Sequence, residues 1–298
     1  MIKTLPFRPN SLLTVYNTQV MQKIGRYEVD YELGRGGMAE VFLAYDPYTK
    51  RQVAIKVLLN FLAGDERVQI FFHREAEVIA ALEHPCIVPI FDFGFHENDP
   101  YFVMRYMSGG TLRERMDAQE FRPTQMSRIF ERVAAGLDAA HAKGIIHRDV
   151  KPANIMFDQD GLAYLSDFGI AKLRRRDDDT TDAMVVGTPV YMSPEQIQNN
   201  DIDGRCDVYA LGVILFQILT GKPPFQGETP TMTAAAHVME PIPRLSQIRS
   251  DLPVQWDAII QKALAKDPEE RYPTAGALAR DIKELVSGRW YLRKLADF

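Results

Sequence analysis

Between residues 27 and 106, hydrophobic residues alternate with polar ones or gather in short runs bounded by glycine and proline. Such patterns are typical of β-strands. The expected strands cover residues 27–29, 41–44, 53–57, 86–93 and 101–106. Residues 65–82 instead carry apolar residues at helical spacing, which predicts one helix among the strands.

A mainly helical half follows. Ser108-Gly109-Gly110 is a flexible break that predicts a boundary between two lobes. We expect helices at residues 111–116 and 124–143, short strands at 155–157 and 163–165, and further helices from about residue 205 to 288. The longest apolar run, residues 208–219, is too short to span a bilayer and predicts a buried helix. Residues 1–23 show no clear periodicity, and we interpret them as an N-terminal extension.

The composition is that of a globular protein and narrows the function. The 298 residues are 46% hydrophobic and 25% charged, which fits about two domains or lobes with sizeable cores. The net charge of −5 argues against a protein that binds nucleic acid by neutralising its phosphates. Cys86 and Cys206 lie far apart, which favours two buried thiols in a reducing compartment. No Cys/His group has zinc-ligand spacing, and the N-terminus is a poor signal peptide.

The strongest chemical signal is the stretch His147-Arg148-Asp149-Val150-Lys151-Pro152-Ala153-Asn154. Asp149 offers a carboxylate that could accept a hydroxyl proton, Lys151 an ammonium that could steady a phosphate, and Asn154 an amide oxygen for a cation. Asp167, at the start of Asp167-Phe168-Gly169, offers a second carboxylate for a metal ion. Phosphoryl transfer depends mostly on positioning and on neutralising negative charge, so these are the groups that it needs.

Three weaker signals precede that stretch. Glycines in residues 33–41 predict a hairpin turn whose amides could approach a phosphate, although an ordinary hairpin has the same pattern. Lys56 is a single lysine in an apolar strand, which fits a phosphate ligand or a guard on an edge strand equally well. Glu75 lies in the predicted helix, where it is either part of a solvated face or an ion-pair partner for Lys56.

In this order, these motifs resemble those of the eukaryotic-like protein kinases over about residues 24–286, and most of all the bacterial Ser/Thr kinases. The resemblance implies a two-lobed α+β fold. Residues 24–104 would form an N-lobe with a five-stranded antiparallel sheet and one main helix. Residues 105–109 would form the hinge, residues 110–287 a helical C-lobe, and residues 288–298 a C-terminal tail.

The resemblance also implies the cofactors, ATP and Mg²⁺, with Mn²⁺ as an alternative metal. The nucleotide contacts that it implies are Leu33, Gly34, Arg35, Gly36, Gly37, Met38, Ala39, Glu40, Val41, Ala54, Lys56, Met104, Arg105, Tyr106, Met107 and Met156. Among these, Met104 would be the gatekeeper, and residues 105–107 would meet the adenine through their backbone.

The resemblance implies a role for each reactive residue. Asp149 would be the catalytic base, and Lys151 would contact the γ-phosphate. Lys56 would hold the α- and β-phosphates in an ion pair with Glu75. The metal ligands would be Asn154 and Asp167. Two structural features are implied as well: an apolar column of Ile79, Ile90, His147 and Phe168, and an ion pair between Glu195 and Arg271.

Two positions depart from the family's motifs. The third glycine of the phosphate loop is Ala39, from which we expect a mild effect because alanine is small. The usual Ala-Pro-Glu reads Ser193-Pro194-Glu195, as in bacterial members. Lys151 after Asp149, and Gly187-Thr188-Pro189, resemble the Ser/Thr branch.

Regulation is implied by Arg148, which in the family pairs with a phosphate on the activation loop. We expect autophosphorylation at Thr180 or Thr181, in the charged stretch of residues 173–186. The alternative is that both threonines only keep a solvated loop soluble.

Two other functions compete with an active Ser/Thr protein kinase. A pseudokinase scaffold or nucleotide sensor usually lacks one of the residues that here are Lys56, Asp149 and Asp167. A small-molecule kinase is disfavoured by residues 187–195 and the helical region after them.

The expected partners are protein substrates, with no nucleic acid and no membrane segment in this chain. Relatives dimerise through the N-lobe, although nothing in this sequence requires it. The expected location is the cytoplasm, or the cytoplasmic part of a membrane-anchored kinase.

Overall fold

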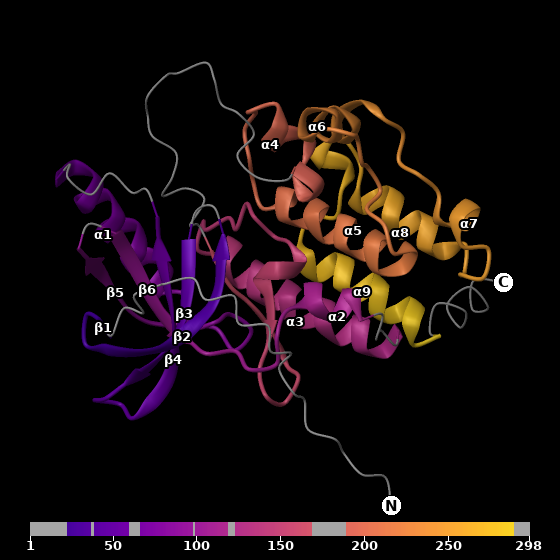
Figure 1. Cartoon of the computed structure of the whole chain (residues 1–298). Helices are drawn as coiled ribbons and strands as arrows, with labels where there is room; N and C mark the ends of the chain where they lie inside the picture. The colour runs from indigo at the N-terminus through magenta and orange to yellow at the C-terminus, as the bar shows by residue number, and fades with distance from the viewer. Residues whose placement is uncertain are drawn as a thin grey trace, which may run out of the picture.

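The computed structural model describes residues 23–36, 39–59, 66–97, 99–118, 123–168 and 189–288. It has two parts, a sheet with one helix and a larger helical part (Figure 1). Within the described ranges the sheet has six antiparallel strands in the order β1-β2-β3-β4-β6-β5. The strands are β1 Lys23–Ile24, β2 Tyr27–Gly36, β3 Ala39–Asp46, β4 Arg51–Leu58, β5 Ile90–His96 and β6 Asp99–Arg105.

The strand count corrects the expectation of five. The additional strand, β1, pairs with the start of β2 across a tight turn at Gly25, whose φ of 56° suits a residue without a Cβ. Ile24 is fully buried, so the short strand adds an apolar side chain to the core of the N-lobe. Lys23, assigned from the sequence to the N-terminal extension, is therefore part of the sheet.

The strand expected at residues 86–93 is also partly wrong, because β5 begins only at Ile90. Pro85 and Pro89 flank the first half of the segment and have no N–H to donate to a sheet. This half turns away to the helical part instead, where the backbone N–H of Val88 donates to Leu165 O at 2.9 Å. Residues 86–89 thus join the two parts of the molecule.

Helix α1, Glu66–Ala80, covers one face of the sheet. Phe72 and Ala76 are fully buried along its inner side. The Phe72 ring lies 5.0 Å from the ring of Phe95 and 5.3 Å from that of Phe102, which are on β5 and β6. This aromatic packing fixes the helix against the strands that lead to the hinge.

The helical part is built around α5, Arg205–Thr220, whose residues from Cys206 to Phe216 are all buried. The helix predicted from the apolar run at 208–219 is thereby confirmed. The other described helices are α2 Leu112–Asp117, α3 Pro123–His141, α4 Pro194–Ile197, α6 Pro230–Met239, α7 Leu245–Ile248, α8 Gln255–Ala263 and α9 Ala275–Val286. The short 3-10 helices are η1 Pro152–Asn154, η3 Pro189–Tyr191 and η4 Pro268–Glu270.

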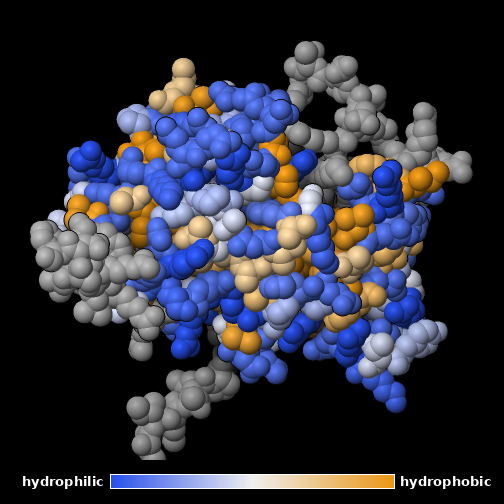
Figure 2. Space-filling model, turned by 180° about the vertical axis from the view of Figure 1, so that it is seen from behind, coloured by the Kyte–Doolittle hydropathy of each residue, from blue (hydrophilic) through white to orange (hydrophobic). Residues whose placement is uncertain are grey.

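The two predicted short strands form a hairpin, β7 Ile155–Phe157 and β8 Ala163–Leu165, with the bounds expected from the sequence. Apolar residues of this hairpin, of α1 and of α5 belong to one continuous core, so the two parts pack directly on each other. The face shown in Figure 2 is mainly hydrophilic, with hydrophobic residues in separate small groups. In the part of the chain that is described, no helix combines the length and apolarity needed to span a bilayer.

Candidate active site

A buried carboxylate on α5 binds the backbone of the loop that carries Asp149. Asp207 is only 1% exposed, and its two oxygens accept the backbone N–H groups of His147 and Arg148, each at 2.9 Å. His141 Nε2 lies 2.8 Å from the same carboxylate. Arg148 has a φ of 65°, a backbone angle that residues other than glycine rarely adopt. A strained backbone of this kind persists where surrounding contacts fix it.

Asp149, Lys151 and Asn154 come together as predicted. Lys151 Nζ lies 2.7 Å from Asp149 Oδ2. Asn154 Nδ2 donates to Asp149 O at 2.8 Å and to Asp149 Oδ2 at 3.2 Å. Pro152 begins η1, and this turn brings Asn154 back over Asp149. Both of these Asn154 hydrogen bonds use its amide nitrogen, which leaves the amide oxygen out of them.

Asp167 faces Lys56 across the two lobes. Lys56 Nζ lies 2.7 Å from Asp167 Oδ2, and both side chains are largely buried. Burial opposes ionisation of Asp167, but the ammonium of Lys56, with help from His147 and Lys151, outweighs it and lowers the pKa of the carboxyl. The predicted pairing of Lys56 with Glu75 stays a prediction.

The predicted nucleotide contacts lie on neighbouring strands and at the hinge. Gly34 pairs with Val41, Val41 with Lys56, and Ala54 with Met104. The pairing continues between Arg35 and Glu40 and between Gly36 and Ala39, and Leu33 is exposed on β2. Met107 is buried, Tyr106 is half-buried beside it after β6, and Met156 lies on β7. Gly37, Met38, Thr180 and Thr181 fall outside the described residues.

The predicted apolar column is present in part. The rings of His147 and Phe168 lie 4.6 Å apart. Ile79, Ile90 and Phe168 line one pocket together with Met104. The column therefore runs from α1 and β5 to the loop before Asp149, with this pocket between its two halves.

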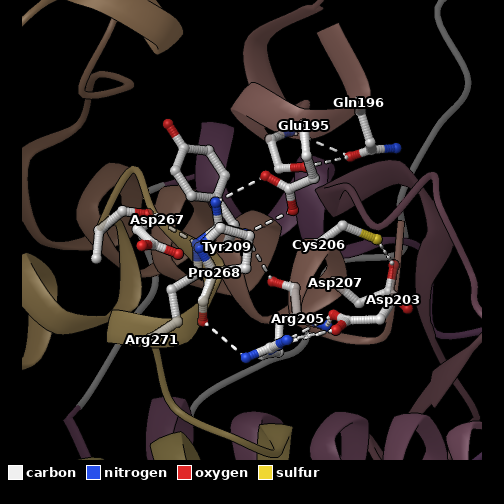
Figure 3. A network of polar contacts seen from close by, with 12 residues as sticks. Glu195, Gln196, Asp203, Arg205, Cys206, Asp207, Tyr209, Asp267, Pro268 and Arg271 are labelled. Carbon is white, nitrogen blue, oxygen red and sulfur yellow. Dashed lines mark hydrogen bonds and ion pairs between the residues drawn. The ribbon is translucent and has the colours of Figure 1, made fainter. Parts of the chain in front are cut away.

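The predicted pair of Glu195 and Arg271 is confirmed (Figure 3). The two terminal nitrogens of the Arg271 guanidinium donate to the carboxylate of Glu195, each at 2.7 Å, and Arg271 is buried. Arg271 also donates to the backbone oxygens of Ala265, Lys266 and Arg205. The pair fixes α4, just after the segment that includes η3, to the core of the helical part.

Sequence reasoning did not find Asp207 or Gln196, which both contact the loop around Asp149. Gln196 Nε2 donates to Arg148 O at 2.8 Å. A signal for Asp207 existed, because a single carboxylate directly before the apolar run of α5 requires a polar partner if it is buried. Gln196 had no such signal, since it lies in a polar segment far from Arg148 in the sequence.

The residues present suit a nucleotide and a divalent cation. Asn154 offers an amide oxygen and Asp167 a carboxylate, and oxygen atoms are the ligands that such cations prefer. Lys56 places an ammonium group beside Asp167, and Lys151 places a second one beside Asp149, where phosphates would be neutralised. The lowered pKa keeps Asp167 ionised and able to bind a metal.

The protein kinase domain family matches residues 27–287, and the chain belongs to this family. The family uses ATP together with a divalent metal ion. The chain is 45% identical over 271 residues to the serine/threonine-protein kinase PknB of Mycobacterium leprae, covering 89% of this chain and 43% of that protein. It is 43% identical over 272 residues to PknB of Mycolicibacterium smegmatis, with the same coverage.

The crystal structure of the PknI kinase domain of Mycobacterium tuberculosis is similar, with a TM-score of 0.72 at 30% identity. The match covers 89% of this chain and 96% of that one. The predicted family and fold class are thereby confirmed. The chain spans less than half the length of the curated relatives that it matches.

Proposed function

We propose that this chain is an active Ser/Thr protein kinase that transfers the γ-phosphate of Mg-ATP to Ser and Thr hydroxyls of proteins. The observation that carries the proposal is that Lys151 and Asn154 both lie within 2.7–3.2 Å of Asp149. The pair of Lys56 and Asp167 across the two lobes adds the second half of the site. Similarity to bacterial serine/threonine-protein kinases supports the choice of substrate hydroxyl.

The roles of the residues follow from their charges and positions. Asp149 accepts the hydroxyl proton and orients the hydroxyl oxygen toward the phosphate. Lys151 neutralises charge on the phosphate that is transferred, and Lys56 holds the phosphates nearer the adenine. Asn154 and Asp167 hold Mg²⁺, which when bound neutralises the phosphate oxygens. The hinge, residues 105–107, presents backbone groups to the adenine.

A comparison of Asp149→Asn with the native chain tests this function. The amide cannot accept the proton, so turnover with radiolabelled ATP and a protein substrate should fall by orders of magnitude while ATP binding changes little. Asp160→Asn, at an exposed position in the β7–β8 turn, is the matched control and should keep native turnover. Nucleotide binding by a native chain that transfers no phosphate would instead indicate a pseudokinase.

We also propose that Thr180 or Thr181 is autophosphorylated and that Arg148 binds the phosphate. The support is the position of Arg148 directly before Asp149, where a bound phosphate would act on the catalytic loop, residues 147–154. Mass spectrometry of active protein should find phosphate between Asp177 and Thr188. An unmodified segment in a fully active sample would contradict this regulation.

The partners follow from the same activity. A protein kinase acts on protein substrates, and the net charge of −5 supports a function without nucleic acid. Dimerisation through the N-lobe and a location on the cytoplasmic side stay predictions.

A further inference from the structure

The peptide group between Arg148 and Asp149 is held at both ends by side chains. Its carbonyl oxygen accepts the hydrogen bond from Gln196 Nε2 at 2.8 Å. Its N–H, which belongs to Asp149, donates to His147 Nδ1 at 3.2 Å. The same His147 ring contacts Ser166 O through Nε2 at 2.8 Å, so the ring itself is fixed in position.

This peptide follows the strained residue Arg148, whose φ is 65°. Asp207 fixes the N–H of Arg148, on the entering side of that residue. Gln196 fixes its carbonyl, on the side that leads to Asp149. The strained conformation is therefore determined from both sides, and rotation of the peptide would turn the Asp149 side chain away from Lys151 and Asn154.

Neighbouring residues hold the Gln196 side chain in the orientation that this contact needs. Its Oε1 accepts hydrogen bonds from the backbone N–H of Ser193 at 3.1 Å and from Ser193 Oγ at 3.2 Å, which fixes the orientation of the amide. The preceding residue, Glu195, is held by the two hydrogen bonds from Arg271. Figure 3 shows Glu195 and Gln196 on neighbouring positions of α4, with Asp207 on α5. Such support holds a functional group in a narrow range of positions.

We propose that Gln196 is a positioning residue for phosphoryl transfer: its amide holds the Arg148 carbonyl and thereby the direction in which Asp149 points. The inference rests on the proposed function, in which Asp149 accepts the proton of the substrate hydroxyl. It also connects α4, which contains the end of the segment of residues 187–195, to the loop of residues 147–154. Gln196 acts through Asp149 and does not touch the reacting atoms.

The first test separates turnover from nucleotide affinity. Gln196→Ala leaves the carbonyl without its donor, so kcat should fall about tenfold while KM for ATP changes less than twofold. The control is Gln198→Ala, at the exposed C-cap of the same short helix, where kcat should stay at the native value. An unchanged kcat for Gln196→Ala, beside a native chain that is active and an inactive Asp149→Asn, would overturn the positioning role and leave the proposed function intact.

The second test uses the shape of glutamate, which matches that of glutamine. In Gln196→Glu a protonated carboxyl can still donate to Arg148 O, whereas an ionised carboxylate repels it. The ratio of variant to native kcat should therefore fall as the pH rises through the pKa of the introduced carboxyl. Among the described residues, the charged groups around this contact include Arg148, Asp149, Asp207 and Glu195, and the three carboxylates are already bound to their own partners. A ratio that does not change with pH contradicts the proposal.

The third test does not depend on activity. Hydrogen–deuterium exchange of peptides that cover residues 145–154 should become faster in Gln196→Ala and stay native in Gln198→Ala, because the released peptide opens more often. Native exchange in Gln196→Ala would overturn the proposal. If the native chain transferred no phosphate, the proposed function would fail, and this measurement would still decide whether Gln196 holds the loop.

Discussion

Lys56 and Asp167 illustrate how one contact between residues serves both lobes. A buried carboxylate is costly unless a positive charge compensates it, and the ammonium at 2.7 Å does so here. The same ammonium lowers the pKa of Asp167 against the effect of burial. The carboxylate is thus kept charged, the state in which it can hold a metal ion, before any nucleotide is bound.

His237 is a buried residue outside the site that makes stability depend on pH. It is fully buried on α6, and its Nδ1 lies 2.9 Å from the Tyr209 hydroxyl. Burial, and then the nearby ammonium of Lys266, lower the pKa of His237 to about 4, against a smaller effect of the Val190 backbone. In the unfolded chain the pKa is about 6.5.

Between these two values the unfolded chain binds a proton that the folded chain does not. The contribution of His237 to stability is therefore complete at pH 7 and is lost as the pH falls from about 6.5 toward 4, by roughly 3 kcal/mol. Urea unfolding at pH 7 and pH 4.5 should show a smaller loss in His237→Gln than in the native chain. His73→Gln, at an exposed position on α1, should keep the native loss. Equal losses in all three proteins would contradict this origin.

At the scale of residues, the meeting of Asp149, Lys151 and Asn154 could be predicted because they lie within six positions of the sequence. A short turn is enough to bring them together, and such local geometry follows from the motif itself. Asp207 and Gln196 were missed because they reach the same loop from about 50 to 60 positions away. Only the fold decides which distant side chain lies beneath a given peptide.

At the scale of elements, the pair of Glu195 and Arg271 joins α4 to the loop between η4 and α9. Both side chains are buried, and the pair has two parallel hydrogen bonds. Replacing such a pair as a whole can cost little, but removing one partner leaves a charge that is buried and uncompensated.

Arg271→Met should therefore lower the free energy of unfolding by about 3–5 kcal/mol. Chemical denaturation measures this value directly. Arg249→Met removes an arginine whose ion pair with Asp251 is exposed to solvent, and it should cost much less. Similar losses for the two variants would show that burial does not decide the contribution of the pair.

The elements themselves were predicted where the pattern is long or bounded by clear turns. The strands β7 and β8 and the core helix α5 follow directly from their apolar residues. The boundary of β5 could not be predicted from hydrophobicity, because residues 86–89 are apolar but do not belong to the strand. They pack between the lobes, and Ile87 bridges to Leu165 while Ile90 begins the strand. Burial alone does not distinguish a strand from such a connection.

At the scale of the whole molecule, the hinge of residues 105–109 is joined to the helical part by its backbone and by side chains. The backbone at the end of the hinge binds β7, with Gly109 N donating to Phe157 O and Phe157 N to Gly110 O, each at 2.8 Å. The side chain of Arg105 makes the second connection. Its Nη1 donates to the Tyr164 hydroxyl on β8 at 3.3 Å, and its guanidinium lies 5.3 Å from the centre of that ring.

Tyr164 is itself held from the helical part. Arg132 on α3 lies 4.9 Å from the ring centre and donates to the backbone oxygens of Ala163 and Pro85. In the β7–β8 hairpin, Tyr164 is the direct partner of Met156, one of the predicted nucleotide contacts. The contact of Arg105 with Tyr164 therefore sets the hinge relative to the strand that carries Met156.

Arg105→Ala should raise KM for ATP about threefold and leave kcat nearly unchanged, since it loosens the adenine side of the cleft and not the groups around Asp149. Arg105→Lys, which keeps a cation over the ring, should recover part of the affinity. Steady-state kinetics at varied ATP concentration separate the two constants. The control is Arg113→Ala, at an exposed arginine on α2 that is paired with Asp117. Arg35→Ala is not a suitable control, because Arg35 lies in the predicted phosphate loop. A fall in kcat with unchanged KM in Arg105→Ala would mean that this contact acts on the catalytic groups and not on the position of the hinge.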